Sequence, residues 1–305
     1  MEIANDDFLW WPVESSKTEL PEEVTVLVIE SLAGKRALFV PGRRATPYQA
    51  ERFNEDIVVN TLWALMETGW GINPKRLIAL PILTEGLGVP FNAAFHRVWP
   101  GQEIGGRCAS WLKRRRMRKS QKDEKYDPFK AEAFRFDTNP IEELEEGSLV
   151  GITFDIGATG TTIEKHTESL LDLTNRFSHL IFASPCTSLE AARRFVAAAT
   201  AGDLEPQNLA VVANEGLCGL DQNGTFLSFQ LPGAITSPGN LALSRKCYPN
   251  PRFCHIGAGG LRANSQEGYK KERERDEKTL GKLPHFTSLE EAMKSAKVAW
   301  PEDFG

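Results

Sequence analysis

Short apolar runs alternate with helix-type segments between about residues 76 and 215. The runs lie at 76–83, 148–155, 179–183 and 209–213, and helical segments at 89–98, 164–173 and 189–199 separate them. A nearly continuous apolar run of this length is typical of a strand buried on both faces, as in a parallel sheet. Strands that alternate with helices predict a doubly wound α/β fold, with a mostly parallel sheet and helices on both faces.

The flanking regions predict smaller elements around this core. We expect residues 1–69 to pack on the core, residues 70–210 to form it, and residues 211–305 to form a C-terminal region. Within that last region, residues 211–263 are the candidate for a small irregular hood. The expected flanking strands are 23–30, 35–40, 133–137 and 225–230, and the expected flanking helices are 48–68, 267–282 and 288–298. From Pro232 the chain is rich in proline, glycine and asparagine and has little periodicity.

Composition limits the compartment and the partners of the chain. The net charge is −5, so any site for a polyanion must be a local cluster of basic residues. No run approaches the ~20 apolar residues of a membrane span, and the start resembles no signal peptide. The five cysteines are odd in number and widely spaced. We therefore predict a cytoplasmic protein with reduced thiols and no membrane partner.

The segment 149–162 (LVGITFDIGATGTT) is the most informative one for function. A buried strand ends at Asp155, a turn of small and hydroxyl residues follows, and then a helix begins. Ligands of open α/β sheets bind at the carboxyl ends of strands. Gly157 and Gly160 let the backbone approach a ligand closely, and the amides of Thr159–Thr162 would lie at a helix N-terminus, which favours an anion. These residues predict binding of a phosphate monoester, with Asp155 accepting hydrogen bonds from ribose hydroxyls.

This run resembles the phosphoribosyl-pyrophosphate (PRPP) signature of type I phosphoribosyltransferases. That signature has apolar residues, two acids, two apolar residues, a small or acidic residue, and then Thr-Gly-x-Thr. Asp155 falls on the second acid, and Ala158 falls on the small position. The loop that binds the 5′-phosphate corresponds to Thr159–Thr162, which includes Gly160 and Thr161. The strict match covers about fourteen residues, and the order of elements extends it over 70–215.

The sequence departs from the family at one position. Phe154 stands where the family has the first of its two acids, which usually hold the ribose 2′- and 3′-hydroxyls. A degenerate binding protein or a changed sugar substrate is therefore an alternative. An ordinary strand–turn–helix, whose glycines serve only the turn, is another.

Two upstream segments correspond in order to loops of the family. Thr84, Glu85 and Gly86 follow the first core strand, where the family keeps its pyrophosphate loop. The basic arm, residues 113–125, lies where the family has a flexible loop that closes over the site. Its residues Lys113, Arg114 and Arg116, with Arg115, Arg118 and Lys119, would neutralise pyrophosphate. A solvated surface loop and a contact to nucleic-acid phosphates are the alternatives for this arm.

The resemblance implies transfer of ribose 5-phosphate from PRPP to a small nitrogenous acceptor, with release of pyrophosphate. It implies Mg²⁺ bound to PRPP, an oxocarbenium-like state, and a homodimer, because the family commonly forms dimers. Lys113, Arg114 and Arg116 would act with Asp155 in catalysis, mainly by positioning and charge stabilisation. The alternative function is a non-catalytic regulator that senses PRPP or a nucleotide and binds nucleic acid through the basic arm.

Three further signals are weak. Cys247, Cys254 and His255 lack the spacing of a zinc knuckle, so we predict no protein-bound metal site. Cys186 follows a core strand, but a nucleophile would need a nearby base such as His179 or His166. The segment 214–217 also follows a core strand and is a weak candidate for an acceptor pocket.

Overall fold

The fold is described from a computed structural model of the chain. It describes residues 8–40, 47–83, 90–103, 105–107, 110–116, 129–136, 149–170, 176–222, 224, 227–251, 274, 277–278, 281–282, 284 and 286–304. The predicted helix at 267–282 falls mostly outside these residues. None of the helices in the described part of the chain is long and apolar enough to span a bilayer.

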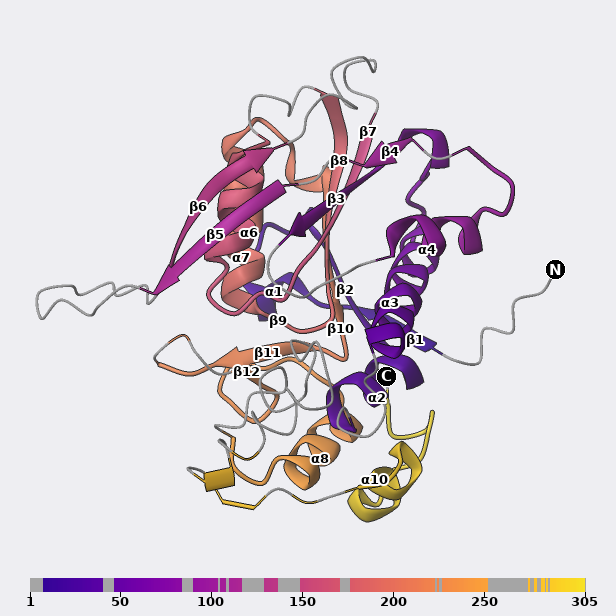
Figure 1. Cartoon of the computed structure of the whole chain (residues 1–305), viewed down its shortest axis with the longest axis vertical. Coiled ribbons are helices and arrows are strands. Elements are labelled where there is room, and N and C mark those ends of the chain that lie inside the picture. Colours follow the sequence, from indigo (N-terminus) through magenta and orange to yellow (C-terminus); the bar gives the residue numbers. More distant parts are fainter. Residues whose placement is uncertain are drawn as a thin grey trace, which may run out of the picture.

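Nine of the described strands form one sheet (Figure 1). The order is β1-β2-β10-β8-β7-β3-β5-β6, and β4 pairs with β3 beside β5. The strands β2, β10, β8, β7, β3 and β5 run parallel, whereas β1 and β6 pair antiparallel with their neighbours. The bounds are β1 Phe8–Pro12, β2 Thr25–Ser31, β3 Leu77–Leu83, β4 Gly106–Arg107, β5 Ser110–Arg116, β6 Phe129–Phe136, β7 Leu149–Phe154, β8 Phe177–Ser184 and β10 Leu209–Asn214. The prediction of a mostly parallel α/β sheet is confirmed.

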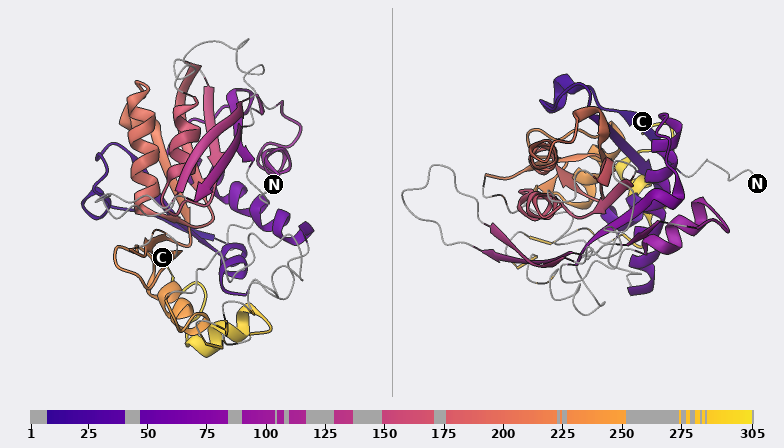
Figure 2. Two further views of the ribbon diagram at one scale, coloured as in Figure 1. Left: turned by 60° about the vertical axis from the view of Figure 1, so that its left-hand side comes forward. Right: turned by 90° about the horizontal axis from the view of Figure 1, so that it is seen from above.

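Helices cover both faces of this sheet, and each face has its own apolar core. Seen from above in Figure 2, α3 and α4 lie on one side and α6 and α7 on the other. On the α3/α4 side, Ile57 and Phe95 pack on Ile152 and Val212; on the other side, Phe195 packs in the cluster of Phe182 and its neighbours. The helices are α1 Ser15–Thr18, α2 Leu32–Phe39, α3 Pro47–Glu67, α4 Phe91–Val98, α6 Thr161–Glu168, α7 Leu189–Ala201, α8 Pro238–Cys247 and α10 Leu289–Ala296, with 3-10 turns η3 Pro74–Arg76 and η5 Pro206–Asn208.

The C-terminal region packs against one end of the sheet, below β8 and β10 in Figure 1. A second small sheet has the order β12-β11-β9, with β9 Thr187–Ser188, β11 Leu217–Leu220 and β12 Leu227–Ser228. A third apolar core joins Ile156, just past β7, to Leu227, Leu243 of α8 and Ala292 of α10. These elements therefore lie over the carboxyl end of β7, where ligands of such sheets bind. The domain boundaries at 69 and 210 stay predictions.

The strand expected at 35–40 is wrong, because these residues belong to α2. Ser31 caps this helix, and its side chain accepts a hydrogen bond from the Gly34 amide at 2.9 Å. Lys35 is fully buried and Leu38 is 1% exposed. Ala37 and Phe39 are also buried, so nearly every residue of this short helix faces the protein, as in a buried strand. The Ser31 cap was the available signal for a helix start.

The basic arm is not a loop throughout. Residues up to Arg116 belong to β5, which pairs antiparallel with β6 and parallel with β3. The basic residues 113–116 pair with β6, which holds them extended although their composition is typical of a solvated loop. Residues 117–125 lie outside the described residues. The weak strand expected at 133–137 corresponds to the end of β6.

Smaller differences follow from caps and turns. Helix α6 starts at Thr161, three residues before the expected start, and β12 is only two residues long.

The C-terminal region contains α8, which the periodicity of the sequence does not predict. Ser237 caps α8 by accepting from the Asn240 amide at 3.2 Å, and Pro238 occupies its first turn. A Ser-Pro pair of this kind is a start signal that the sequence contained.

Candidate functional site

The turn between β7 and α6 brings the predicted phosphate-binding residues together. Asp155 follows the last residue of β7 and is 5% exposed. Gly160 is the N-cap of α6 and has φ 80°, in the left-handed region that favours glycine. As a glycine, this N-cap residue has no side chain that could cap the helix. Because the first N–H groups of a helix have no intrahelical acceptor, the N-terminus of α6 suits an anion.

The threonines of this turn are mostly buried. Thr159 is 9% exposed and Thr162 is 8% exposed. The hydroxyls of Thr159 and Thr161 lie 2.9 Å apart and hydrogen-bond to each other. Either hydroxyl can be the donor in that pair. This pairing orders both side chains at the start of α6.

The segment before α7 forms hydrogen bonds with the turn between β7 and α6. The Ser188 amide donates to the Gly157 carbonyl at 2.7 Å, and the Thr187 hydroxyl donates to the same oxygen at 3.2 Å. The Ser188 hydroxyl donates to the Ala158 carbonyl. The Gly157 amide donates to the Cys186 carbonyl at 3.3 Å, so this amide is used by the protein itself. Both carbonyls therefore accept hydrogen bonds from the segment that precedes α7.

Both glycines of the turn are also required by packing. A Cβ at Gly157 would lie 2.5 Å from the Thr187 hydroxyl oxygen and 2.6 Å from the Cβ of Ala191. A Cβ at Gly160 would lie 2.7 Å from the Cα of Ala191. The alternative in which the glycines serve the turn therefore holds in part, since close approach of α7 accounts for both without any ligand.

Charged side chains flank the N-terminus of α6. Arg194 of α7 contacts Glu164, in the first turn of α6, through Nη1 at 3.0 Å and Glu190 through Nε at 3.0 Å. Arg194 offsets the negative charge of Glu164, which would otherwise repel a phosphate at this helix start.

Phe154 lies away from the turn. It is 2% exposed, and its ring meets the ring of Phe91 edge-on, with centroids 6.4 Å apart. Successive side chains of a strand point to opposite faces, so Phe154 belongs to the α4 side and Asp155 to the other. The position of the family's first acid is thus a core position here, and Asp155 is the carboxylate at the end of β7.

The structure does not test the other predicted site residues. Thr84, Glu85 and Gly86 lie outside the described residues. Lys113, Arg114 and Arg116 are on β5, which is separated from β7 by β3. The structure therefore joins Asp155 with Ala158–Thr162 and leaves the roles of the pyrophosphate loop and the basic arm as predictions.

Cys186 does not have the surroundings of a nucleophile. It is fully buried, and its Sγ atom lies 3.2 Å from the Sγ atom of Cys218. A hydrogen bond with Cys218 and burial raise the pKa of Cys186 well above its usual value. A reactive cysteine needs an exposed and readily ionised thiol.

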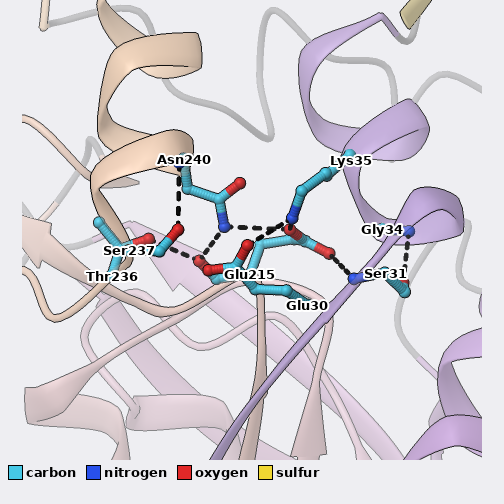
Figure 3. A network of polar contacts seen from close by, with 8 residues as sticks. All are labelled: Glu30, Ser31, Gly34, Lys35, Glu215, Thr236, Ser237 and Asn240. Atoms are coloured by element: carbon cyan, nitrogen blue, oxygen red, sulfur yellow. Dashed lines mark hydrogen bonds and ion pairs between the residues drawn. The ribbon is translucent and has the colours of Figure 1, made fainter. Parts of the chain in front are cut away.

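A buried ion cluster, which sequence reasoning missed, lies at the same end of the sheet (Figure 3). Lys35 Nζ contacts Glu30 Oε2 at 2.5 Å and Glu215 Oε2 at 2.7 Å, and all three side chains are fully buried. The rings of Phe304 and Trp300 lie 4.1 and 4.8 Å from Lys35 Nζ. Glu215 follows β10, where the sequence indicated a weak candidate for an acceptor pocket. Protein groups instead surround it.

Both the side chain and the backbone carbonyl of Glu215 accept hydrogen bonds from other segments. Its Oε1 atom accepts from the Ser31 amide at 2.8 Å, and its carbonyl accepts from Thr236 at 2.7 Å and from Asn240 at 2.8 Å. Its φ of 64° is unusual for a residue other than glycine. A Cβ at Gly34 would lie 2.3 Å from Glu215 Oε1, so only glycine fits at this position of α2. These contacts join β2, α2, β10 and α8 around one buried charge.

Burial raises the pKa of Glu30 from 4.5 to about 7; Lys35 opposes this rise and Glu215 adds to it. A carboxyl whose pKa is raised in the folded state stabilises the fold fully below its unfolded pKa. That contribution is lost as the pH rises through the folded pKa. Between pH 4.5 and 7.5, we expect the free energy of unfolding of wild type to fall by about 3 kcal/mol relative to that of Glu30→Gln. Urea unfolding of both proteins across this range measures the difference.

A difference between variants is needed because His166 acts in the opposite direction. Burial lowers the pKa of His166 from 6.5 to about 3, so its contribution is lost as the pH falls below 6.5. The two effects oppose each other between pH 4.5 and 6.5. Glu14→Gln, an exposed carboxyl paired with Lys17, is the control and should show no such slope. If the difference in free energy of unfolding between wild type and Glu30→Gln stayed constant with pH, the raised pKa of Glu30 would be contradicted.

No protein-family model and no curated protein matches this chain. Among solved structures, it aligns with an adenine phosphoribosyl transferase from Trypanosoma brucei in complex with AMP, pyrophosphate and ribose-5-phosphate. The two chains are 12% identical, the alignment covers 67% of this chain and 87% of that chain, and the TM-score is 0.36. A similarity of this size carries no argument, so the geometry of the turn has to support any function.

Proposed function

We propose that this chain is a phosphoribosyltransferase-like enzyme that binds ribose 5-phosphate at the turn between β7 and α6. In this proposal PRPP donates the sugar phosphate to a nitrogenous acceptor, and pyrophosphate leaves. The observation that carries the proposal is the N-terminus of α6. It has Gly160 at positive φ as its N-cap and a carboxylate at the end of the preceding parallel strand.

Each residue of the turn has a role in this proposal. The amides and hydroxyls of Thr159–Thr162 bind the 5′-phosphate, since amide groups at a helix start favour an anion. Asp155 accepts a hydrogen bond from a ribose hydroxyl. The β5–β6 hairpin contacts α6. In this proposal Lys113, Arg114 and Arg116 of β5 bind the pyrophosphate, and Thr84, Glu85 and Gly86 bind it through their amides.

The turn suits Mg²⁺ only as part of the substrate complex. Among the described residues, no three His, Cys, Asp or Glu side chains form a metal-binding group. Mg²⁺ is commonly held by one or two carboxylates together with substrate phosphates and water. Asp155 would be the protein carboxylate near a Mg²⁺ bound to PRPP, and the ion would offset the charge of the leaving pyrophosphate.

Calorimetric titration with ribose 5-phosphate and with PRPP plus Mg²⁺ tests the site. We expect Thr159→Val to weaken binding of ribose 5-phosphate by about tenfold, because a lost hydrogen bond to a charged group costs roughly 1–3 kcal/mol. Thr200→Val makes the same change on α7, where the hydroxyl donates to the Val196 carbonyl within the helix. That control should bind as wild type does. Equal affinity of wild type and Thr159→Val would remove this threonine from the site.

A second candidate is a non-catalytic sensor of PRPP or a nucleotide. The specific observation in its favour is Phe154, which occupies the position of a ribose carboxylate and is buried against Phe91. Pyrophosphate release across a panel of nitrogenous acceptors discriminates the two candidates. Binding of PRPP without release for any acceptor favours the sensor, and release with one acceptor favours the enzyme.

A further inference from the structure

Cys186 and Cys218 lie against each other between the core and the small sheet. They are 32 residues apart in the sequence, and their Sγ atoms are 3.2 Å apart. Cys186 lies between β8 and β9, and Cys218 lies on β11, which pairs with β9 through Leu217–Thr187 and Cys218–Ser188. The two side chains are 0% and 1% exposed. The strand pairing therefore holds both sulfur atoms in place.

We propose that Cys186 and Cys218 form a reversible disulfide when the chain meets a small-molecule disulfide such as oxidised glutathione. One cysteine thiolate attacks a glutathione sulfur, which gives a mixed disulfide and releases one glutathione thiolate. The second cysteine thiolate then attacks the protein sulfur of the mixed disulfide and releases the second glutathione. The two thiol protons of the protein pass to the two glutathione molecules. The protein is oxidised by two electrons, and the glutathione disulfide is reduced.

The geometry requires little movement for this bond. A disulfide has an S–S length of about 2.05 Å, so the two sulfur atoms need to approach by about 1.2 Å from their present 3.2 Å. Cys186 comes directly before β9, whereas Cys218 lies on β11 opposite Ser188, so the pair is diagonal to the strand pairing. The contact between the sulfur atoms is therefore the observation that supports the bond.

The surroundings of the pair disfavour the stable mixed disulfide. Both cysteines belong to an apolar cluster with Ile156, Leu227 and Phe229. A charged glutathione chain does not fit into such a cluster, because close packing leaves no space for it. The second sulfur, which is already adjacent, displaces the glutathione. Attack requires a transient opening of β11 and an ionised thiol, so the reaction is slow and becomes faster as the pH rises.

The disulfide would connect the C-terminal region to the candidate site. The carbonyl of Cys186 accepts from the Gly157 amide at 3.3 Å, and the next residues, Thr187 and Ser188, hold the carbonyls of Gly157 and Ala158. A bond to Cys218 would fix this segment to β11. We expect amide hydrogen exchange of residues 157–161 to slow by severalfold in the oxidised protein.

Disulfide mapping tests the proposal. The variant Cys108→Ser/Cys254→Ser leaves three thiols, which are Cys186, Cys218 and Cys247, all buried. This protein is incubated with oxidised glutathione at pH 8, digested, and analysed by mass spectrometry. The expected product has lost two hydrogen atoms and contains a peptide that links Cys186 to Cys218. Dithiothreitol should restore both thiols.

Two additional single variants are the matched controls. Cys247→Ser should keep the link, because Cys247 is also buried in the same cluster and the 3.2 Å sulfur contact joins Cys186 to Cys218. Cys218→Ser should lose it. The melting temperature shows whether the disulfide is compatible with the native fold. A disulfide that forms in the folded protein should raise the melting temperature by roughly 5 °C. Absence of the link at equilibrium, a persistent glutathione adduct, a link to Cys247 or a lowered melting temperature would each overturn the proposal.

Discussion

Lys35→Met is expected to lower the free energy of unfolding by about 3–5 kcal/mol at pH 8, because two buried carboxyl groups lose their cation and must either stay uncompensated or take up a proton. Glu30 and Glu215 contact Lys35 at 2.5 and 2.7 Å, and all three side chains are fully buried. No solvent is available to screen the two remaining charges. Urea unfolding at pH 8, followed by circular dichroism, measures the loss.

The loss should be smaller at pH 5.5. Burial has already raised the pKa of Glu30 to about 7, so at pH 5.5 one of the two carboxyls carries a proton and the repulsion is relieved. The triple variant Lys35→Met/Glu30→Gln/Glu215→Gln removes all three charges together. It should regain part of the lost stability at pH 8, because no buried charge is then left uncompensated.

Lys17→Met is the matched control for this experiment. Lys17 forms an ion pair with Glu14 at 3.6 Å, and the two side chains are 60% and 73% exposed. Exposed pairs contribute ~0.2–1 kcal/mol, so this variant should change stability by no more than that. If Lys35→Met cost no more than Lys17→Met, the buried cluster would have no special importance for the fold.

Gly160→Ala is expected to reduce affinity for ribose 5-phosphate at least tenfold and to lower stability by about 2–4 kcal/mol. Two physical effects add at this position. The φ of 80° disfavours a side chain, and the new Cβ would lie 2.7 Å from the Cα of Ala191, which is backbone and does not yield easily. The start of α6 must shift away from α7, and the amides that we propose to bind phosphate shift with it. Titration calorimetry and urea unfolding measure the two effects.

Gly233→Ala separates the strain from the clash. Gly233 has φ 81°, and a Cβ there would meet nothing within 4 Å. This control should lose about 1 kcal/mol and bind ribose 5-phosphate as wild type does. If Gly160→Ala lost stability but kept full affinity, the N-terminus of α6 would be excluded as the phosphate site. The glycine would then serve only the packing of α7.

The buried clusters show why part of the site was not predictable. Lys35 lies 5 residues from Glu30 and 180 residues from Glu215, and Cys186 lies 32 residues from Cys218. No local pattern indicates which distant residues meet. The segment 35–40 contains a buried lysine among apolar residues. It is too short for its periodicity to distinguish a helix from a strand. The composition of the basic run up to Arg116 predicts a loop. This run is part of a strand because β5 pairs with β3 and β6, and local composition does not show that pairing.

The sequence by itself determined the βα core and the turn at residues 155–160. Apolar runs and helical periodicity are local properties, and the strand, the acid, the glycines and the helix start are contiguous in the chain. Only the tertiary structure decided the order of the strands and the burial of Phe154 against α4. It alone revealed that α7 requires both glycines of the turn and that a lysine and two carboxylates meet at the end of β2. These features depend on which surfaces pack together, and burial energy depends on contacts between segments that are far apart in the chain.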